Sequence, residues 1–155
     1  MSALKMDGKV IAERIRKEIA GKVAKLSTPI GLGTILVGSD PGSVAYVDGK
    51  HKDCAQVGIK SIKVNLPDSV LTADVVAAVN KLNQDPNCTG FIVQLPLPSG
   101  IDVQEVLSAI DPKKDADGLT PTNLGNLVLS FNEIIPCTPK AIVALLNEYK
   151  IKLSG

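Results

Sequence analysis

The run Gly33-Thr34-Ile35-Leu36-Val37-Gly38 decides the fold class, because an apolar, strand-like segment is followed directly by a turn and a helix. The residues of Ser39-Asp40-Pro41-Gly42 suit a turn. We expect Ser43 to cap the helix that follows, since its hydroxyl can accept a bond from a free backbone N–H. On that helix Tyr46 and Lys50 are four residues apart, so they lie on the same face.

The pair of Tyr46 and Lys50 has two interpretations. A phenol beside an ammonium offers a flat stacking surface and a proton-transfer group in one place, and a desolvated lysine can lose its proton near neutral pH. The alternative is a half-buried ring with a solvated amine, which is the commoner use of this spacing. Taken alone, the spacing favours the alternative.

Helix-like and strand-like segments alternate along the rest of the chain. Strands are expected at Ile59–Leu66 and Phe91–Val93, and a strand-like run begins at Ile151. Helices are expected with these limits: one capped by Asp7 and ended by Thr28-Pro29, one from Thr72 to Asp85, one from Asp102 to Pro112, and a last one capped by Thr138. The segment from Thr120 to Asn126 is predicted as a polar connection. This alternation predicts an α/β class: a three-layer-like domain with a short, mainly parallel sheet flanked by helices.

Composition excludes several classes of function. The chain of 155 residues has 17 basic and 16 acidic side chains, 3% aromatics and no Trp, which does not favour binding to nucleic acid. Cys54, Cys88 and Cys137 are far apart and odd in number, so we expect reduced, buried thiols and a reducing compartment. Only His51 lies near enough to Cys54 to form a metal-ligand pair, and no metal site is expected. No apolar run approaches the ~18 residues of a membrane span, so a cytoplasmic protein is expected.

Three polar features lie where strands are expected to end, which is where open α/β sheets bind ligands. They are the Tyr46–Lys50 pair, Gln94 after Phe91–Val93, and Asp117 in a glycine-containing turn. Each has a plainer interpretation: Gln94 can bond its own loop, and Asp115 and Asp117 can form a solvated turn. Together they predict a pocket that binds a flat heterocycle over the tyrosine ring and moves one proton. The run from Gly38 to Gly42 lacks the spacing of either common nucleotide fingerprint.

Four motifs in this order resemble one family over essentially the whole chain. They are Val37-Gly38-Ser39-Asp40-Pro41 with Tyr46-Val47-x-x-Lys50, Val93-Gln94-Leu95-Pro96-Leu97-Pro98, Lys114-Asp115-Ala116-Asp117-Gly118, and Pro136-Cys137-Thr138-Pro139. In these motifs the sequence resembles the bifunctional methylenetetrahydrofolate dehydrogenase/methenyltetrahydrofolate cyclohydrolases. The resemblance implies NADP-dependent oxidation of methylenetetrahydrofolate, hydrolysis of the product to formyltetrahydrofolate, and a place in one-carbon metabolism and purine biosynthesis.

The resemblance also implies roles for individual residues. Lys50 is expected to be the general acid/base of the hydrolysis, and Tyr46 to stack on the substrate and order the lysine. Gln94 is expected to bond and tune Lys50, and Asp117 to hold the pterin. Leu95 and Pro96 are expected to contribute backbone and apolar contact to the substrate. No residue of this chain is expected to bind NADP or a metal.

The family continues beyond a segment like Ile151–Gly155 into a Rossmann-type domain that holds the cofactor, and that domain is absent from this sequence. We therefore expect residues 1–138 to form the folate-binding catalytic domain, and residues 139–155 to form a linker helix and the start of the missing NADP-binding domain. Family members are homodimers, but the missing part leaves dimerisation of this chain open. A second hypothesis is a folate-binding or docking module without turnover. A third hypothesis is a purely structural α/β domain.

Overall fold

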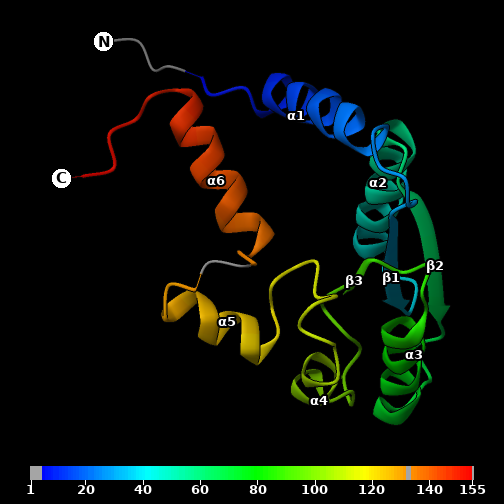
Figure 1. Ribbon diagram of the computed structural model, residues 1–155. Coiled ribbons are helices and arrows are strands. Elements are labelled where there is room, and N and C mark those ends of the chain that lie inside the picture. Colours follow the sequence, from blue (N-terminus) through cyan, green and yellow to red (C-terminus); the bar gives the residue numbers. More distant parts are fainter. Residues whose placement is uncertain (1–4, 132–133, 155) are drawn as a thin grey trace.

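The fold is built on a sheet of three parallel strands in the order β2-β1-β3 (Figure 1). The computed structural model describes residues 5–131 and 134–154. Strand β1 (Gly31–Val37) lies in the centre, β2 (Lys60–Leu66) on one side and β3 (Gly90–Val93) on the other. Parallel neighbours need helical crossovers, and the connections here contain helices. The predicted α/β class with a short, mainly parallel sheet is confirmed.

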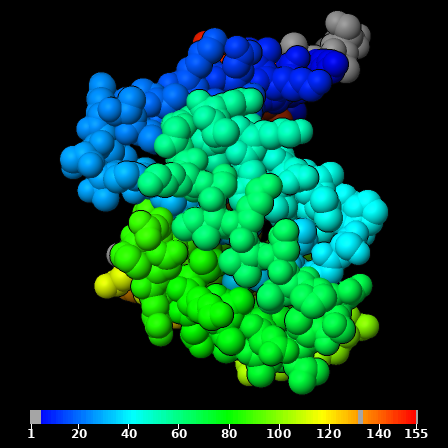
Figure 2. Space-filling model, turned by 90° about the vertical axis from the view of Figure 1, so that its right-hand side faces the viewer, coloured from blue at the N-terminus to red at the C-terminus, as the bar shows by residue number. Residues whose placement is uncertain are grey.

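Six helices accompany the sheet within the described residues. Their bounds are α1 Gly8–Val23, α2 Pro41–Val57, α3 Thr72–Gln84, α4 Val103–Ser108, α5 Pro121–Val128 and α6 Cys137–Glu148. Viewed from the side of β2, the surface runs from α1 through the cyan-to-green residues of α2 and β2 to α3 (Figure 2). Helix α6 lies on the far side of the molecule from α3 (Figure 1).

The two faces of β1 carry different packing, because successive side chains of a strand point to opposite faces. Ile35 and Val37 belong to the main hydrophobic core with Val75 and Val79 of α3. Thr34 points to the other face, where its hydroxyl meets His51 of α2. The sheet is therefore covered by α3 on one face and by α2 on the other, and α2 starts from the loop that follows the carboxyl end of β1.

Several element ends differ from the sequence predictions. Helix α2 begins at Pro41 with Asp40 as its cap; the Asp40 carboxylate accepts from the Ser43 N–H at 2.8 Å, so Ser43 is not the cap. Proline is well suited to this first helical position because its missing N–H has no partner to lose. Helix α6 begins at Cys137 after Pro136, so Thr138 is not its cap either. In both cases the expected cap lies one or two residues inside the helix.

Helix α5 was missed, and the expected final strand does not form in the described residues. Thr120 caps α5 through a bond from the Asn123 N–H, and Pro121 occupies its first turn, but the polar composition of the segment hid this signal. Residues 151–154 form no strand. Within the described part of the chain, no helix is long and apolar enough to cross a membrane.

The segment after α4 is organised by Asp115, which is 2% exposed and so does not fit the plainer interpretation as a solvated turn residue. Its carboxylate accepts from the N–H groups of Gly118 and Thr120, both at 2.8 Å, and from the Asn123 side chain at 2.9 Å. Burial opposes ionisation of Asp115, but the bonds from Thr120, Asn123 and Leu119 outweigh it and hold its pKa below the usual value. A buried carboxylate thus holds the turn that contains Asp117.

The two phenylalanines provide a matched test of the core. Phe91 is 0% exposed and Phe131 is 63% exposed. Phe91→Ala leaves a cavity and is expected to lower the free energy of unfolding by about 3–5 kcal/mol, a large part of the ~5–15 kcal/mol of a typical domain. Phe131→Ala is expected to change it by less than about 0.5 kcal/mol. Urea denaturation measures both; equal losses would contradict the assigned core.

Asp115→Asn replaces a carboxylate oxygen with an NH₂ group that faces backbone donors, so we expect a loss of about 1–3 kcal/mol. Because the folded-state pKa of Asp115 is lowered, its stabilisation is present above the unfolded-state value of about 4 and is lost as pH falls through the folded-state pKa. The variant should therefore show a weaker loss of stability in acid than the wild type. Asp117→Asn is the control, since Asp117 is only half-buried. A variant as stable as the wild type, with the same acid dependence, would refute this role.

Candidate functional site

A cavity of about 670 Å³ lies beside the carboxyl end of the sheet. Tyr46 and Lys50 reach it from α2, and Gln94 and Leu95 reach it from the segment that follows β3. Asp117 reaches it from the turn held by Asp115. The structure therefore brings together the lysine, the amide, the carboxylate and the aromatic ring that the sequence placed in one pocket.

Lys50 is the centre of the polar half of this cavity. Its Nζ donates to Gln94 Oε1 at 3.3 Å and lies 5.2 Å from the centre of the Tyr46 ring. The second distance is within the range of a cation–π contact. Both contacts hold the amine at the cavity, while Tyr46 keeps 68% of its surface exposed and free to stack on a flat ligand.

Gln94 is held from both its backbone and its side chain. Its N–H donates to Ile35 O of β1 at 2.8 Å, which continues the β1–β3 pairing by one residue. Its Nε2 donates to Leu95 O at 2.6 Å, which orients the amide so that Oε1 faces Lys50. Gln94 thus bonds its own loop, as the plainer interpretation had it, and the same bond makes its oxygen available to the lysine.

Cys137 is a cavity residue to which the sequence assigned no role. Its thiol donates to Ala116 O at 3.3 Å, which links the start of α6 to the turn of Asp117. The residue as a whole is exposed, contrary to the expected buried thiol, but desolvation at the sulfur and the nearby Asp117 raise the pKa of the thiol and keep it protonated. Its place in the Pro136-Cys137-Thr138-Pro139 motif was the only signal in the sequence.

The other half of the cavity is apolar and lies between α1 and α6. The residues that line it are mainly small or aliphatic: Gly8, Ile11, Ala12 and Ile15 from α1, and Ala141, Ile142, Ala144 and Leu145 from α6. Aliphatic side chains recur every four residues along α1, at Ile11, Ile15, Ile19 and Val23, and of these only Ile11 is buried. Ile11 and Ile15 border the cavity.

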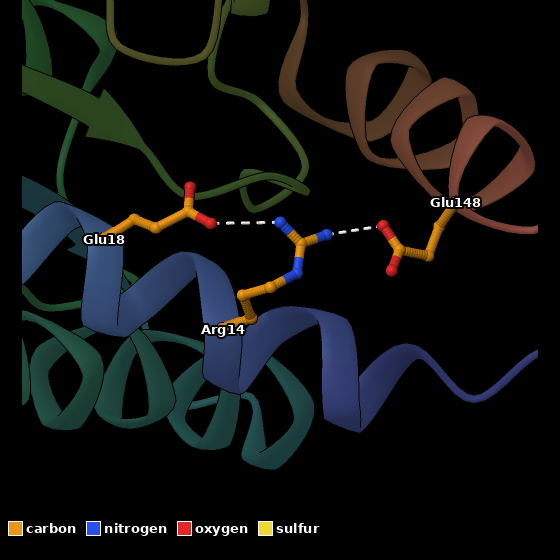
Figure 3. A network of polar contacts seen from close by, with 3 residues as sticks. All are labelled: Arg14, Glu18 and Glu148. Carbon is orange, nitrogen blue, oxygen red and sulfur yellow. Dashed lines mark hydrogen bonds and ion pairs between the residues drawn. The ribbon is translucent and has the colours of Figure 1, made fainter.

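Polar contacts fasten α6 to α1 at the outer end of the cavity. Arg14 of α1 bonds Glu18 at 3.0 Å and Glu148 of α6 at 2.5 Å (Figure 3). The Asp7 N–H donates to the Tyr149 hydroxyl at 2.7 Å. The ion pairs are about half exposed, so each contributes at most about 1 kcal/mol. Because α6 has no buried residue, these contacts matter for its placement.

Some predicted site features are not brought into the cavity. Pro96 follows Leu95 through a cis peptide bond, is exposed and does not line the cavity. His51 is buried, and its Nε2 lies 2.9 Å from Thr34 Oγ1. No cluster of three or more metal-ligating side chains occurs in residues 5–131 and 134–154.

The glycine-containing loop before α2 does not fit the phosphates of a nucleotide cofactor. The amino end of α2 there is already capped by Asp40, whose negative charge would repel a phosphate. The backbone bond to Ser43, and then the bond to its side chain, lower the pKa of Asp40, which keeps the carboxylate ionised.

Comparison with known proteins shows the family and the fold of the chain. The model of the tetrahydrofolate dehydrogenase/cyclohydrolase catalytic domain matches residues 6–117. A crystal structure of the bifunctional enzyme FolD, methylenetetrahydrofolate dehydrogenase/cyclohydrolase, from Campylobacter jejuni is 38% identical with a TM-score of 0.93; the match covers 97% of this chain and 55% of that one. The Trypanosoma brucei methylenetetrahydrofolate dehydrogenase-cyclohydrolase, complexed with NADP cofactor and inhibitor, is 36% identical with a TM-score of 0.95; the match covers 100% of this chain and 55% of that one.

A silkworm (Bombyx mori) methylenetetrahydrofolate dehydrogenase is 34% identical, with a TM-score of 0.92 over 97% of this chain and 53% of that protein. The chain thus spans about half the length of the relatives that it matches. The match of the family model and the cavity of Lys50, Gln94, Tyr46 and Asp117 lead to one conclusion: this chain belongs to the tetrahydrofolate dehydrogenase/cyclohydrolase family and carries its catalytic domain.

Proposed function

We propose that this chain binds a reduced folate in the cavity beside Lys50 and supplies the residues that hydrolyse methenyltetrahydrofolate to formyltetrahydrofolate. The observation that carries the proposal is the hydrogen bond from Lys50 to Gln94 at the edge of a cavity that Tyr46 and Asp117 also line. A flat, polar heterocycle with an aromatic extension fits such a combination of stacking surface, carboxylate and amine.

In the proposed complex, Tyr46 stacks on the aminobenzoyl ring and Asp117 accepts hydrogen bonds from the pterin. Leu95 contributes apolar contact, while Pro96 acts through the shape of the loop because it does not line the cavity. These assignments come from the positions of the side chains in the cavity and from the roles that the family motifs imply. Residues 1–138 would then form the folate-binding part, and residues 139–155 the connection toward a nucleotide-binding part.

The hydrolysis requires one group that moves a proton. Water attacks the electron-poor carbon between the two folate nitrogens, and the Lys50 amine takes the proton that the water loses. The bond from this carbon to one nitrogen then breaks as the new hydroxyl loses its proton to solvent and the carbonyl forms, and that nitrogen receives the first proton through Lys50. Gln94 Oε1 holds the amine within reach throughout.

We further propose that oxidation of methylenetetrahydrofolate uses the same folate position but requires NADP on a nucleotide-binding part that the described residues do not contain. NADP is favoured over NAD only by the family motifs in the sequence. The same proposal includes a role in one-carbon metabolism and purine biosynthesis, and a cytoplasmic location. Any dimer that the chain forms belongs to it as well.

The alternative function is folate binding without turnover. It is favoured by the exposure of Tyr46, which leaves one side of the site without a covering element in the described structure. The two functions differ in whether hydrolysis is observed. A binding module binds its ligand but shows no hydrolysis, whichever residue stands at position 50.

Lys50→Met keeps the length of the side chain but removes its proton acceptor. We expect hydrolysis of methenyltetrahydrofolate, followed by its absorbance, to fall by about 10²–10⁴-fold. Binding of a stable reduced folate, measured by calorimetry, should weaken far less. Lys52→Met, which is exposed on the same helix, is the matched control and should retain wild-type activity. Full activity in Lys50→Met would disprove the assigned role, and no hydrolysis by the wild type would favour the binding module.

The chain by itself should not bind NADP, because its glycine-containing loop is capped by Asp40 and lacks a phosphate cradle. Calorimetry with NADP should show no saturable heat, and incubation with methylenetetrahydrofolate and NADP should give no NADPH absorbance. A folate titration under the same conditions is the positive control. Steady production of NADPH by this chain would contradict the division of roles.

A further inference from the structure

Besides their direct hydrogen bond, Lys50 and Gln94 are linked through a series of contacts between buried residues of α2 and β1. Lys50 is followed on α2 by His51, whose Nε2 lies 2.9 Å from Thr34 Oγ1 on β1. Thr34 is followed by Ile35, whose carbonyl accepts from the Gln94 N–H at 2.8 Å. Gln94 Oε1 in turn accepts from Lys50 Nζ. These three hydrogen bonds and two peptide links form a closed ring that includes the Lys50–Gln94 bond.

The His51–Thr34 contact is the part of this ring that ties α2 to the sheet. His51 is 7% exposed and Thr34 is 0% exposed, so water does not compete for their bond. On the opposite side of the helix Tyr46 is largely exposed, and nothing lies within 4 Å of where a side chain at Gly49 would begin. The rotation of α2 about its axis therefore depends on its buried face, and that rotation decides where Lys50 points.

We propose that His51 is a positioning residue for the site, which acts through its hydrogen bond to Thr34 to hold Lys50 at bonding distance from Gln94. The consequence for turnover rests on the function proposed above. The positioning itself is a property of the fold and is testable without a substrate.

The arrangement requires a neutral imidazole. A neutral imidazole has one N–H and one nitrogen lone pair. Nε2 can form its hydrogen bond with the Thr34 hydroxyl, while the buried Nδ1 carries only a lone pair. Nδ1 has no partner among the described residues. An imidazolium would carry a buried N–H without an acceptor, which costs free energy. Protonation of His51 should therefore break the packing that holds α2.

The surroundings of the imidazole ring also favour its neutral form. Burial is the largest cause of the lowered pKa of His51; Lys63 of β2 lowers it further, and Asp48 of α2 opposes the shift. Strand β1 contributes no charged side chain, and Arg16 of α1 is paired with Asp53 of α2 at 3.4 Å. Protonation thus occurs below the ordinary pH range of histidine. The stabilisation from the neutral ring is present above about pH 6.5 and is lost as pH falls toward the folded-state pKa.

His51 is the single histidine of the chain, so its ring resonances can be followed by NMR without ambiguity. We expect the εCH₂ resonance of Lys50 to shift with the same midpoint as the His51 ring when the pH is lowered from 7.5 to 5. His51→Gln retains an amide near the position of Nε2 but does not titrate, so the shift of the Lys50 resonance in this range should disappear. Titration of His51 with no response of Lys50, or an unchanged response in His51→Gln, would overturn the proposal.

Thr34→Val removes the hydroxyl and keeps the shape of the side chain, whereas Thr34→Ser keeps the hydroxyl. Hydrolysis of methenyltetrahydrofolate at pH 7.5 should fall by about 10- to 100-fold in Thr34→Val and by no more than about twofold in Thr34→Ser. The Lys50 resonance should also move in Thr34→Val alone. Equal behaviour of the two variants would reject the role of the hydroxyl. Wild-type protein that fails to hydrolyse or bind folate at any pH would reject the proposed function, while the Lys50 resonance still decides the positioning.

Discussion

The position of β1 between its two parallel neighbours is the constraint on which the site depends. Its carboxyl end leads into α2, which carries Tyr46 and Lys50, and its Ile35 carbonyl binds the backbone of Gln94 beyond the end of β3. The amine and the amide come from segments 44 residues apart, and they meet because both segments are bonded to adjacent residues of one buried strand. The geometry of the polar site is thus a consequence of strand pairing.

A second buried group, Asp115, performs a similar task for the other side of the cavity. Among the residues that the structure describes, its carboxylate has no cation as partner; backbone and amide N–H groups stabilise it instead, in the manner of an anion bound in a turn. Its bonds keep the segment from Asp115 to Thr120 in one conformation, and Asp117 is presented from that segment. Cys137 then joins the same segment to α6, so the polar and apolar halves of the cavity share a support.

The sequence predicted the class of the fold and the members of the polar site, because these depend on local patterns. Strand-like runs, breaking prolines and a four-residue spacing are visible without a structure, and the motifs joined Tyr46, Lys50, Gln94 and Asp117 in one hypothesis. The features that it missed depend on three-dimensional partners. Asp115 reads as a solvated turn until its donors are known, and His51 reads as a possible metal ligand until Thr34 is found beside it. Helix α5 was missed since its capping signal is carried by Thr120 and Pro121 within a polar segment.

The central claim is that Lys50, Gln94, Tyr46 and Asp117 form one folate site. The most direct test is an NMR titration of the labelled chain with a stable reduced folate, in which the side-chain resonances of these four residues are followed together. The account predicts that all four shift with one common dissociation constant, while residues on the far side of α3 do not respond. Saturable binding that leaves Lys50 and Gln94 unchanged, or that shifts a different surface, would contradict it.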